Sequence, residues 1–178
     1  ASFSIYAYEA LKEELEQVEQ LRFIFTSPTF IKDKSKKEKR EFFIPKLNRE
    51  RNLYGTDFEI RLRNQLSQKA IAKECADWIR RKVQFRSNAS QEQMGGFMHI
   101  NNDTQQVYIP FNEFTTTQLG CERGANVYNV VNVLPSPTAS AYLDIFNEQW
   151  NNDEKFKDVT KRILEYIDTV YQENAPEY

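Results

Sequence analysis

A long helical pattern followed at once by a strand pattern is the feature that most limits how this chain can fold. Apolar residues recur every three or four positions from Phe58 to Lys82, which is the spacing of one face of a helix. The stripe consists of Ile60, Leu62, Leu66, Ala70, Ile71, Cys75, Trp78 and Ile79. The next residues, Val83 to Arg86, are typical of a strand, and Phe23-Ile24-Phe25 is an apolar run typical of a buried strand. Helices and strands therefore alternate, which predicts an α/β fold.

Other segments extend this pattern. Residues 96–100 and 105–111 are strand-like and flank an Asn101-Asn102-Asp103 turn, which predicts a β-hairpin. Phe42 to Ile44 is either a small strand or a loop anchor. Further helices are expected at Tyr8 to Gln20, Thr138 to Trp150 and Asp153 to Glu173, and a further strand at Val127 to Leu134. We therefore expect a mixed β-sheet flanked by helices, with helices at its C-terminal end.

Composition narrows the class of protein. The chain has 178 residues, of which 40% are apolar and 28% charged, so a packed core is expected and disorder throughout is not. Two cysteines and one histidine are too few for a zinc site or a disulfide framework. No stretch approaches the ~20 apolar residues that span a membrane, and the first ten residues lack a secretory signal pattern. We expect a cytoplasmic domain that has no membrane partner and no cofactor.

Charge is unevenly distributed along the chain. Residues 32–86 hold 17 Lys and Arg against 8 Asp and Glu, whereas the net charge of the whole chain is −2. A basic block inside an acidic chain is typical of a surface that binds polyanions, although a solvated helix face with a charged loop gives the same count. The candidate phosphate contacts are Lys36, Lys37, Lys39, Arg40, Arg49, Arg51, Arg80, Arg81, Lys82 and Arg86.

The hairpin resembles the catalytic region of the phospholipase D-like phosphodiesterases. In that superfamily a His-x-Lys strand leads through a short turn to a second strand that ends in Gly-Ser-x-Asn. The residues Met98-His99-Ile100-Asn101 are similar to the first strand. The run from Val107 to Thr115, followed by Leu119-Gly120, is similar to the second. The resemblance implies a phospholipase D-like fold for residues 1–150.

Four further segments resemble a narrower group, the bacterial Swi/Snf-like or DEAD-box-like ATP-dependent helicases that open with a phospholipase D-like domain. They are residues 22–30, Asn52 to Thr56, Ala72 to Ile79 and Leu119 to Gly124. No Walker A motif occurs, so the ATPase part of such a protein lies outside this chain. Residues 151–178 are then expected to form a C-terminal helix leading toward a helicase domain.

The resemblance also implies a degenerate active site. In active members the histidine attacks phosphorus while the lysine binds a phosphate oxygen, and here only His99 is retained. Asn101 occupies the lysine position, Phe111 falls in the Gly-Ser position and Glu113 replaces the asparagine. We therefore expect an inactive accessory domain that binds DNA and the helicase domains of the same parent chain, with a homodimer possible.

Two other functions stay open. One is a phosphodiesterase or nuclease that uses His99 with a lysine from elsewhere, such as Lys73 or Lys82. The other is a protein-interaction or dimerisation module whose acidic C-terminal helices contact the helicase body or a second protomer. The sequence disfavours the nuclease, because no cation stands two residues after the histidine.

Overall fold

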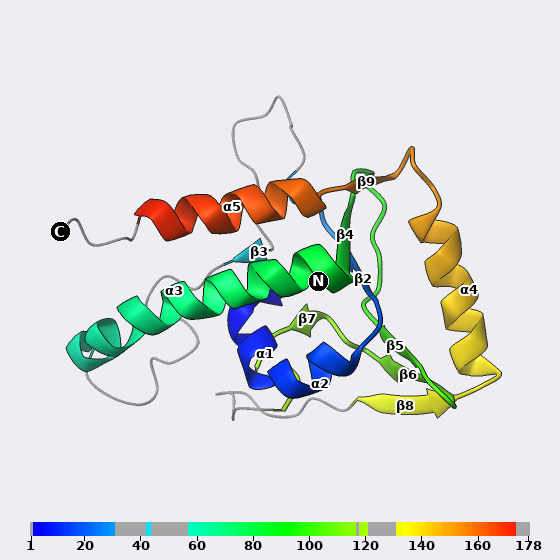
Figure 1. The fold of residues 1–178 in the computed structure, drawn as a ribbon. Coiled ribbons are helices and arrows are strands. Elements are labelled where there is room, and N and C mark those ends of the chain that lie inside the picture. The colour runs from blue at the N-terminus through cyan, green and yellow to red at the C-terminus, as the bar shows by residue number, and fades with distance from the viewer. Residues whose placement is uncertain (1, 31–41, 44–56, 117, 121–130, 174–178) are drawn as a thin grey trace.

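The structure is a computed structural model, and it describes residues 2–30, 42–43, 57–116, 118–120 and 131–173 (Figure 1). Within these residues five helices surround three small sheets. The helices are α1 (Ile5–Ala10), α2 (Lys12–Gln17), α3 (Asp57–Lys82), α4 (Thr138–Trp150) and α5 (Thr160–Glu173). The predicted α/β fold with C-terminal helices is confirmed.

Each sheet has three strands. The first has the order β3 (Phe42–Phe43), β1 (Ser2–Ser4), β7 (Glu113–Phe114), with both pairs parallel. The second has the order β2 (Leu21–Phe25), β4 (Val83–Asn88), β9 (Phe156–Asp158), the first pair parallel and the second antiparallel. The third is antiparallel, with the order β5 (Met98–Asn101), β6 (Gln105–Ile109), β8 (Asn132–Pro135). Only the second sheet is therefore mixed, and the β-structure is divided among three small sheets where one mixed sheet was expected.

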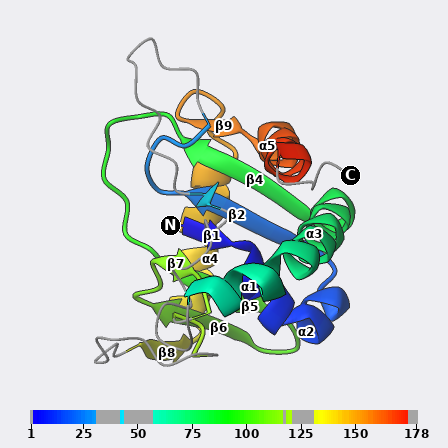
Figure 2. The ribbon, with the colours of Figure 1, turned by 90° about the vertical axis from the view of Figure 1, so that its left-hand side faces the viewer.

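The second sheet is the centre of the molecule because helices cover both of its faces. Figure 2 shows β2 and β4 side by side, and in Figure 1 α3 and α5 lie on one side of them while α4 lies on the other. Side chains alternate along a strand, so Phe25 and Phe85 point into the larger core and Ile24 points to the other face. Parallel strands buried on both faces need apolar residues on both.

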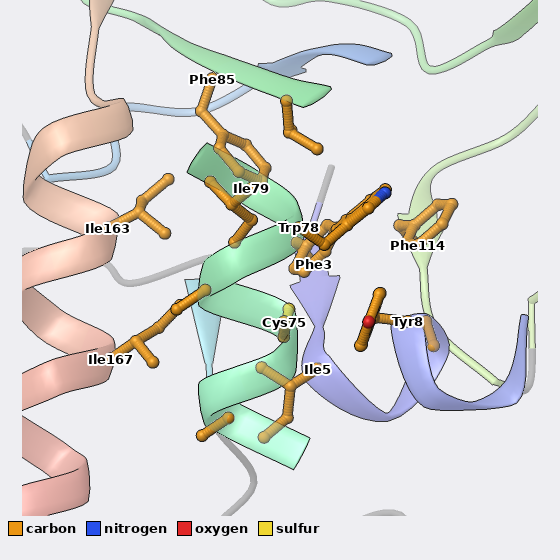
Figure 3. Packing of buried hydrophobic residues seen from close by; sticks show 14 of the residues in the cluster. Phe3, Ile5, Tyr8, Cys75, Trp78, Ile79, Phe85, Phe114, Ile163 and Ile167 are labelled. Atoms are coloured by element: carbon orange, nitrogen blue, oxygen red, sulfur yellow. The ribbon is translucent and has the colours of Figure 1, made fainter. Parts of the chain in front are cut away.

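Aromatic rings dominate the larger core (Figure 3). Phe3 on β1 contacts Trp78 on α3, Phe85 on β4 and Phe114 on β7, so one ring joins three elements. The Trp78 side chain is fully buried, and its indole Nε1 donates a hydrogen bond to the Leu15 carbonyl oxygen at 3.2 Å. Trp78 therefore belongs to the core, as its place on the apolar stripe of α3 predicted.

Two of the expected helices differ from the sequence prediction. The helix expected from Asp153 begins at Thr160, because Phe156–Asp158 pairs with the edge of β4. The Thr160 amide then donates to the Asp158 carboxylate at 2.9 Å, which satisfies an N–H at the start of α5. The single helix expected from Tyr8 to Gln20 is instead two helices, α1 and α2, which meet at Leu11 and end at Gln17. The first begins at Ile5, where the Ser4 hydroxyl caps it by accepting from the Tyr6 amide.

Other boundaries follow the prediction. α3 and α4 have nearly the expected limits, the hairpin of β5 and β6 forms, and Phe42–Phe43 is a strand. The strand expected from Val127 falls partly outside the described residues, and its described end is β8.

Candidate nucleic-acid interface

His99 lies at the second position of β5, directly opposite Val107 on β6. The turn between the two strands is closed by the Asn102 side chain, whose Oδ1 accepts a hydrogen bond from the Thr104 amide at 3.1 Å. Residues opposite one another in an antiparallel pair point to the same face, so His99 shares its face with the fully buried Val107.

That face of the hairpin is the one that α4 covers. Phe97 precedes His99 by two residues and has the same orientation, and its ring packs edge-on against Tyr142 of α4 with centroids 4.9 Å apart. At the other end of the hairpin the Ser140 hydroxyl donates to Gln105 Oε1 at 3.1 Å. His99 is partly buried, and its Nε2 is shielded from solvent and has no hydrogen-bond partner in the described part of the chain. The imidazole therefore faces a helix.

The hairpin provides no cation for phosphate chemistry. Asn101, at the position of the family lysine, is exposed at the end of β5. Glu113 is also exposed, and Phe111 is partly buried. Residues 87–122 contain no Lys or Arg. Of the two lysines considered as substitutes, Lys82 instead donates to the Glu16 carbonyl oxygen, while Lys73 is exposed on α3.

The basic residues at the end of α3 connect helices. The Arg80 guanidinium pairs with Asp77 on α3 at 2.9 Å and with Asp168 on α5 at 3.6 Å. Arg81 forms a bidentate pair with Glu16 on α2, at 2.9 and 3.1 Å. This hydrogen bonding lowers the pKa of Glu16 and raises that of Arg81. Both arginine side chains stay about half exposed, at 47% and 52%.

Arg86 lies apart from this cluster, toward the other end of β4. Its Nη1 pairs with Asp153 at 2.9 Å and contacts the Phe156 carbonyl oxygen at 3.4 Å. Its guanidinium carbon is 5.2 Å from the centre of the Trp150 ring. Its Nε is buried without a hydrogen-bond partner. The four described candidates therefore do not converge on one point. Arg80, Arg81 and Lys82 lie at the end of α3, whereas Arg86 lies toward the far end of β4.

The remaining candidates, Lys36, Lys37, Lys39, Arg40, Arg49 and Arg51, lie outside the described residues.

Arg22 on β2 is a cation that sequence reasoning missed. It is partly buried, and its guanidinium carbon lies 5.0 Å from the centre of the Phe146 ring and 5.6 Å from that of Trp150. Burial lowers the pKa of Arg22. The signal was available in the sequence, because Arg22 interrupts an otherwise apolar strand, Leu21-Arg22-Phe23-Ile24-Phe25.

The described part of the chain offers few other groups for metal binding or catalysis. No cluster of three or more His, Cys, Asp or Glu residues there could hold a metal ion. Cys75 is buried, and burial raises the pKa of its thiol, which disfavours the reactive thiolate. None of the described helices is long and apolar enough to cross a bilayer.

Comparisons with family models, with curated proteins and with solved structures find no match for this chain.

Proposed function

We propose that this chain is an accessory DNA-binding domain of an ATP-dependent helicase and that it catalyses no phosphodiester cleavage itself. The domain contacts the phosphate backbone with Lys and Arg side chains and does not read base sequence. The charge segregation of the sequence and its resemblance to helicase-associated phospholipase D-like domains support this proposal.

The observation that carries the proposal is the separation of the histidine from the cations. Cleavage by a phospholipase D-like site needs a cation next to the nucleophile to stabilise charge on the phosphate. His99 faces α4 on a hairpin that has no Lys or Arg, whereas Arg80 and Arg81 end α3. Binding of a phosphate backbone needs only exposed cations, so this separation favours binding over cleavage.

The ion pairs of Arg80 and Arg81 are compatible with phosphate binding. Ion pairs between exposed side chains contribute little to stability, so a phosphate group can replace a carboxylate at small cost. Asp77, Asp168 and Glu16 then act as competitors that weaken binding without preventing it. The basic residues of segment 32–51 add further charge to the same chain.

The proposal is tested by measuring DNA affinity across a salt series, with cleavage assayed in the same samples. We expect affinity to fall steeply with salt while the DNA stays intact. The double variant Arg80→Ala, Arg81→Ala should weaken binding to all sequences alike, and His99→Ala should leave it unchanged. Lys155→Ala is the matched control, because Lys155 pairs with Glu92 at 2.6 Å beyond the opposite end of β4.

Three results would contradict the proposal: absence of binding at low salt, loss of affinity for selected sequences only, or DNA cleavage that His99→Ala abolishes. The last result would instead establish the nuclease.

A protein-interaction role is the second candidate, and exposed apolar side chains favour it. Ile100 and Val133 lie on the hairpin face that points away from α4, and they are 37% and 48% exposed. Apolar residues gathered on an exposed sheet face are typical of a surface that contacts another protein. Absence of DNA binding together with self-association that Val133→Lys abolishes would favour this role.

A further inference from the structure

Two arginines lie on the face of the second sheet that α4 covers. On adjacent parallel strands, Arg22 pairs in register with Gln84, and Arg86 pairs with Ile24. Residues two apart on a strand share a face, so both arginines point to the same side of the sheet as Ile24. Ile24 packs there with Trp150 of α4 and with Phe156.

The two guanidinium groups share one aromatic ring. Arg86 lies 5.2 Å and Arg22 5.6 Å from the centre of Trp150, and Arg22 also lies 5.0 Å from Phe146. Phe146 and Trp150 stack on one another with centroids 5.7 Å apart. A guanidinium over an aromatic ring uses its flat face, so the N–H groups at its edge stay available for hydrogen bonds.

The described residues neutralise only one of these two charges. Asp153 is the carboxylate that Arg86 contacts, and it is itself 85% exposed. The Arg22 side chain forms neither an ion pair nor a hydrogen bond with any residue that the structure describes. The buried Nε of Arg86 also has no hydrogen-bond partner. Partly buried charges are normally partnered, so the Arg22 guanidinium has N–H donors that no described residue satisfies.

We propose that Arg22 and Arg86 form a binding site for one phosphate-class oxyanion, with Trp150 and Phe146 holding the guanidinium groups in place. The N–H groups at a guanidinium edge bind phosphate through charge-assisted hydrogen bonds, which are stronger than hydrogen bonds between neutral groups. Arg22 is the main contact, because no described carboxylate competes for it, and Arg86 contributes Nη1, from which the anion displaces the exposed Asp153 carboxylate. The anion is either a backbone phosphate of a nucleic acid or a free phosphate compound. The site does not depend on the DNA-binding proposal, because free phosphate would occupy it in a protein that never meets DNA.

The test is a titration with inorganic phosphate at constant ionic strength, with chloride as the replaced anion. Tryptophan fluorescence reports occupancy, because Trp150 is part of the site and Trp78 is buried in the other core. We expect a saturable change in the wild-type protein and an affinity at least about tenfold weaker in Arg22→Gln, because charge-assisted hydrogen bonds are lost. Arg162→Gln makes the same chemical change on α5, which lies across the sheet from α4, so it is the matched control and should bind as the wild type does.

A second variant covers the case in which Arg22→Gln fails to fold. Asp153→Asn removes the competing carboxylate from an exposed position and should tighten phosphate binding. The proposal is overturned if the wild type shows no saturable change, if folded Arg22→Gln binds like the wild type, or if Asp153→Asn does not bind more tightly. A short oligonucleotide then distinguishes the sources: displacement of phosphate identifies a nucleic-acid backbone, and absence of displacement identifies a free phosphate compound.

Discussion

The Phe111 amide donates a hydrogen bond to the Gly96 carbonyl oxygen at 2.9 Å, and this bond joins the chain before β5 to the chain after β6. The approach is so close that a side-chain carbon on Gly96 would collide with the Phe111 carbonyl oxygen and would lie 2.6 Å from Asn112 Oδ1. Only glycine fits at position 96 without a shift of neighbouring atoms. The hydrogen bond also holds together the open end of the hairpin that carries His99.

Gly96→Ala should destabilise the protein by about 1–3 kcal/mol, because the backbone of Phe111 must move to admit a methyl group. Urea unfolding measures the change in the free energy of unfolding. Gly95→Ala is the control, since a side-chain carbon there meets nothing within 4 Å. Equal stability of the two variants would show that the close approach is not maintained in solution.

Trp78→Phe should lower the free energy of unfolding by about 1–3 kcal/mol, through loss of the hydrogen bond to Leu15 and through the space left by the smaller ring. Trp150→Phe makes the same chemical change where the indole N–H has no hydrogen bond with any described residue, so it should cost less. Thermal or urea unfolding compares the two variants. A larger loss in Trp150→Phe would contradict the assignment of Trp78 to the main core.

The buried Tyr8 side chain should make the folded protein less stable at high pH. Burial raises the pKa of Tyr8 to about 12, compared with a value of 10.0 for a free tyrosine. Between these values the unfolded chain releases the proton and the folded chain keeps it. Stability should therefore fall as pH rises from about 10 to about 12, by at most about 1.4 kcal/mol per pH unit from this residue.

Urea unfolding at several pH values measures this slope, and Tyr8→Phe should reduce it while changing stability little at pH 7. An unchanged slope in Tyr8→Phe would mean that other groups cause the alkaline loss.

Glu16→Gln should strengthen DNA binding if Arg81 contacts phosphate. The variant keeps the shape of the side chain but removes the charge that holds Arg81. We expect roughly a two- to fivefold gain in affinity at low salt, which shrinks as salt is added. Fluorescence anisotropy with labelled DNA measures it, and Glu13→Gln on the exposed part of α2 is the control. Equal gains in both variants would indicate a general effect of net charge.

Sequence periodicity was enough to predict the long elements. The stripe on α3 from Ile71 to Ile79, where the side chains are described, and the pattern of α4 reflect burial of one helix face, which is a local property of the sequence. The turn between β5 and β6 was also predictable, because Asn102 supplies its own hydrogen bond to the backbone. The short strands β1 and β9 were not, because a three-residue segment is a strand only when a neighbour pairs with it.

The candidate site was predictable only in part. Counting charges identified the Lys and Arg residues, and the hairpin pattern identified His99. Which of these cations form ion pairs could not be predicted from the sequence, because their partners are far away along the chain. Arg81 pairs with Glu16, and Arg86 pairs with Asp153.

By itself, then, the sequence determined the long helices and the β5–β6 hairpin, because those preferences act over a few neighbouring residues. Only the tertiary structure decided which group each charged side chain contacts. Arg22 and Trp150 are separated by most of the chain, and they come together because α4 packs across β2. Electrostatic and aromatic contacts depend on distance in space, which is fixed only once the sheets and helices have packed.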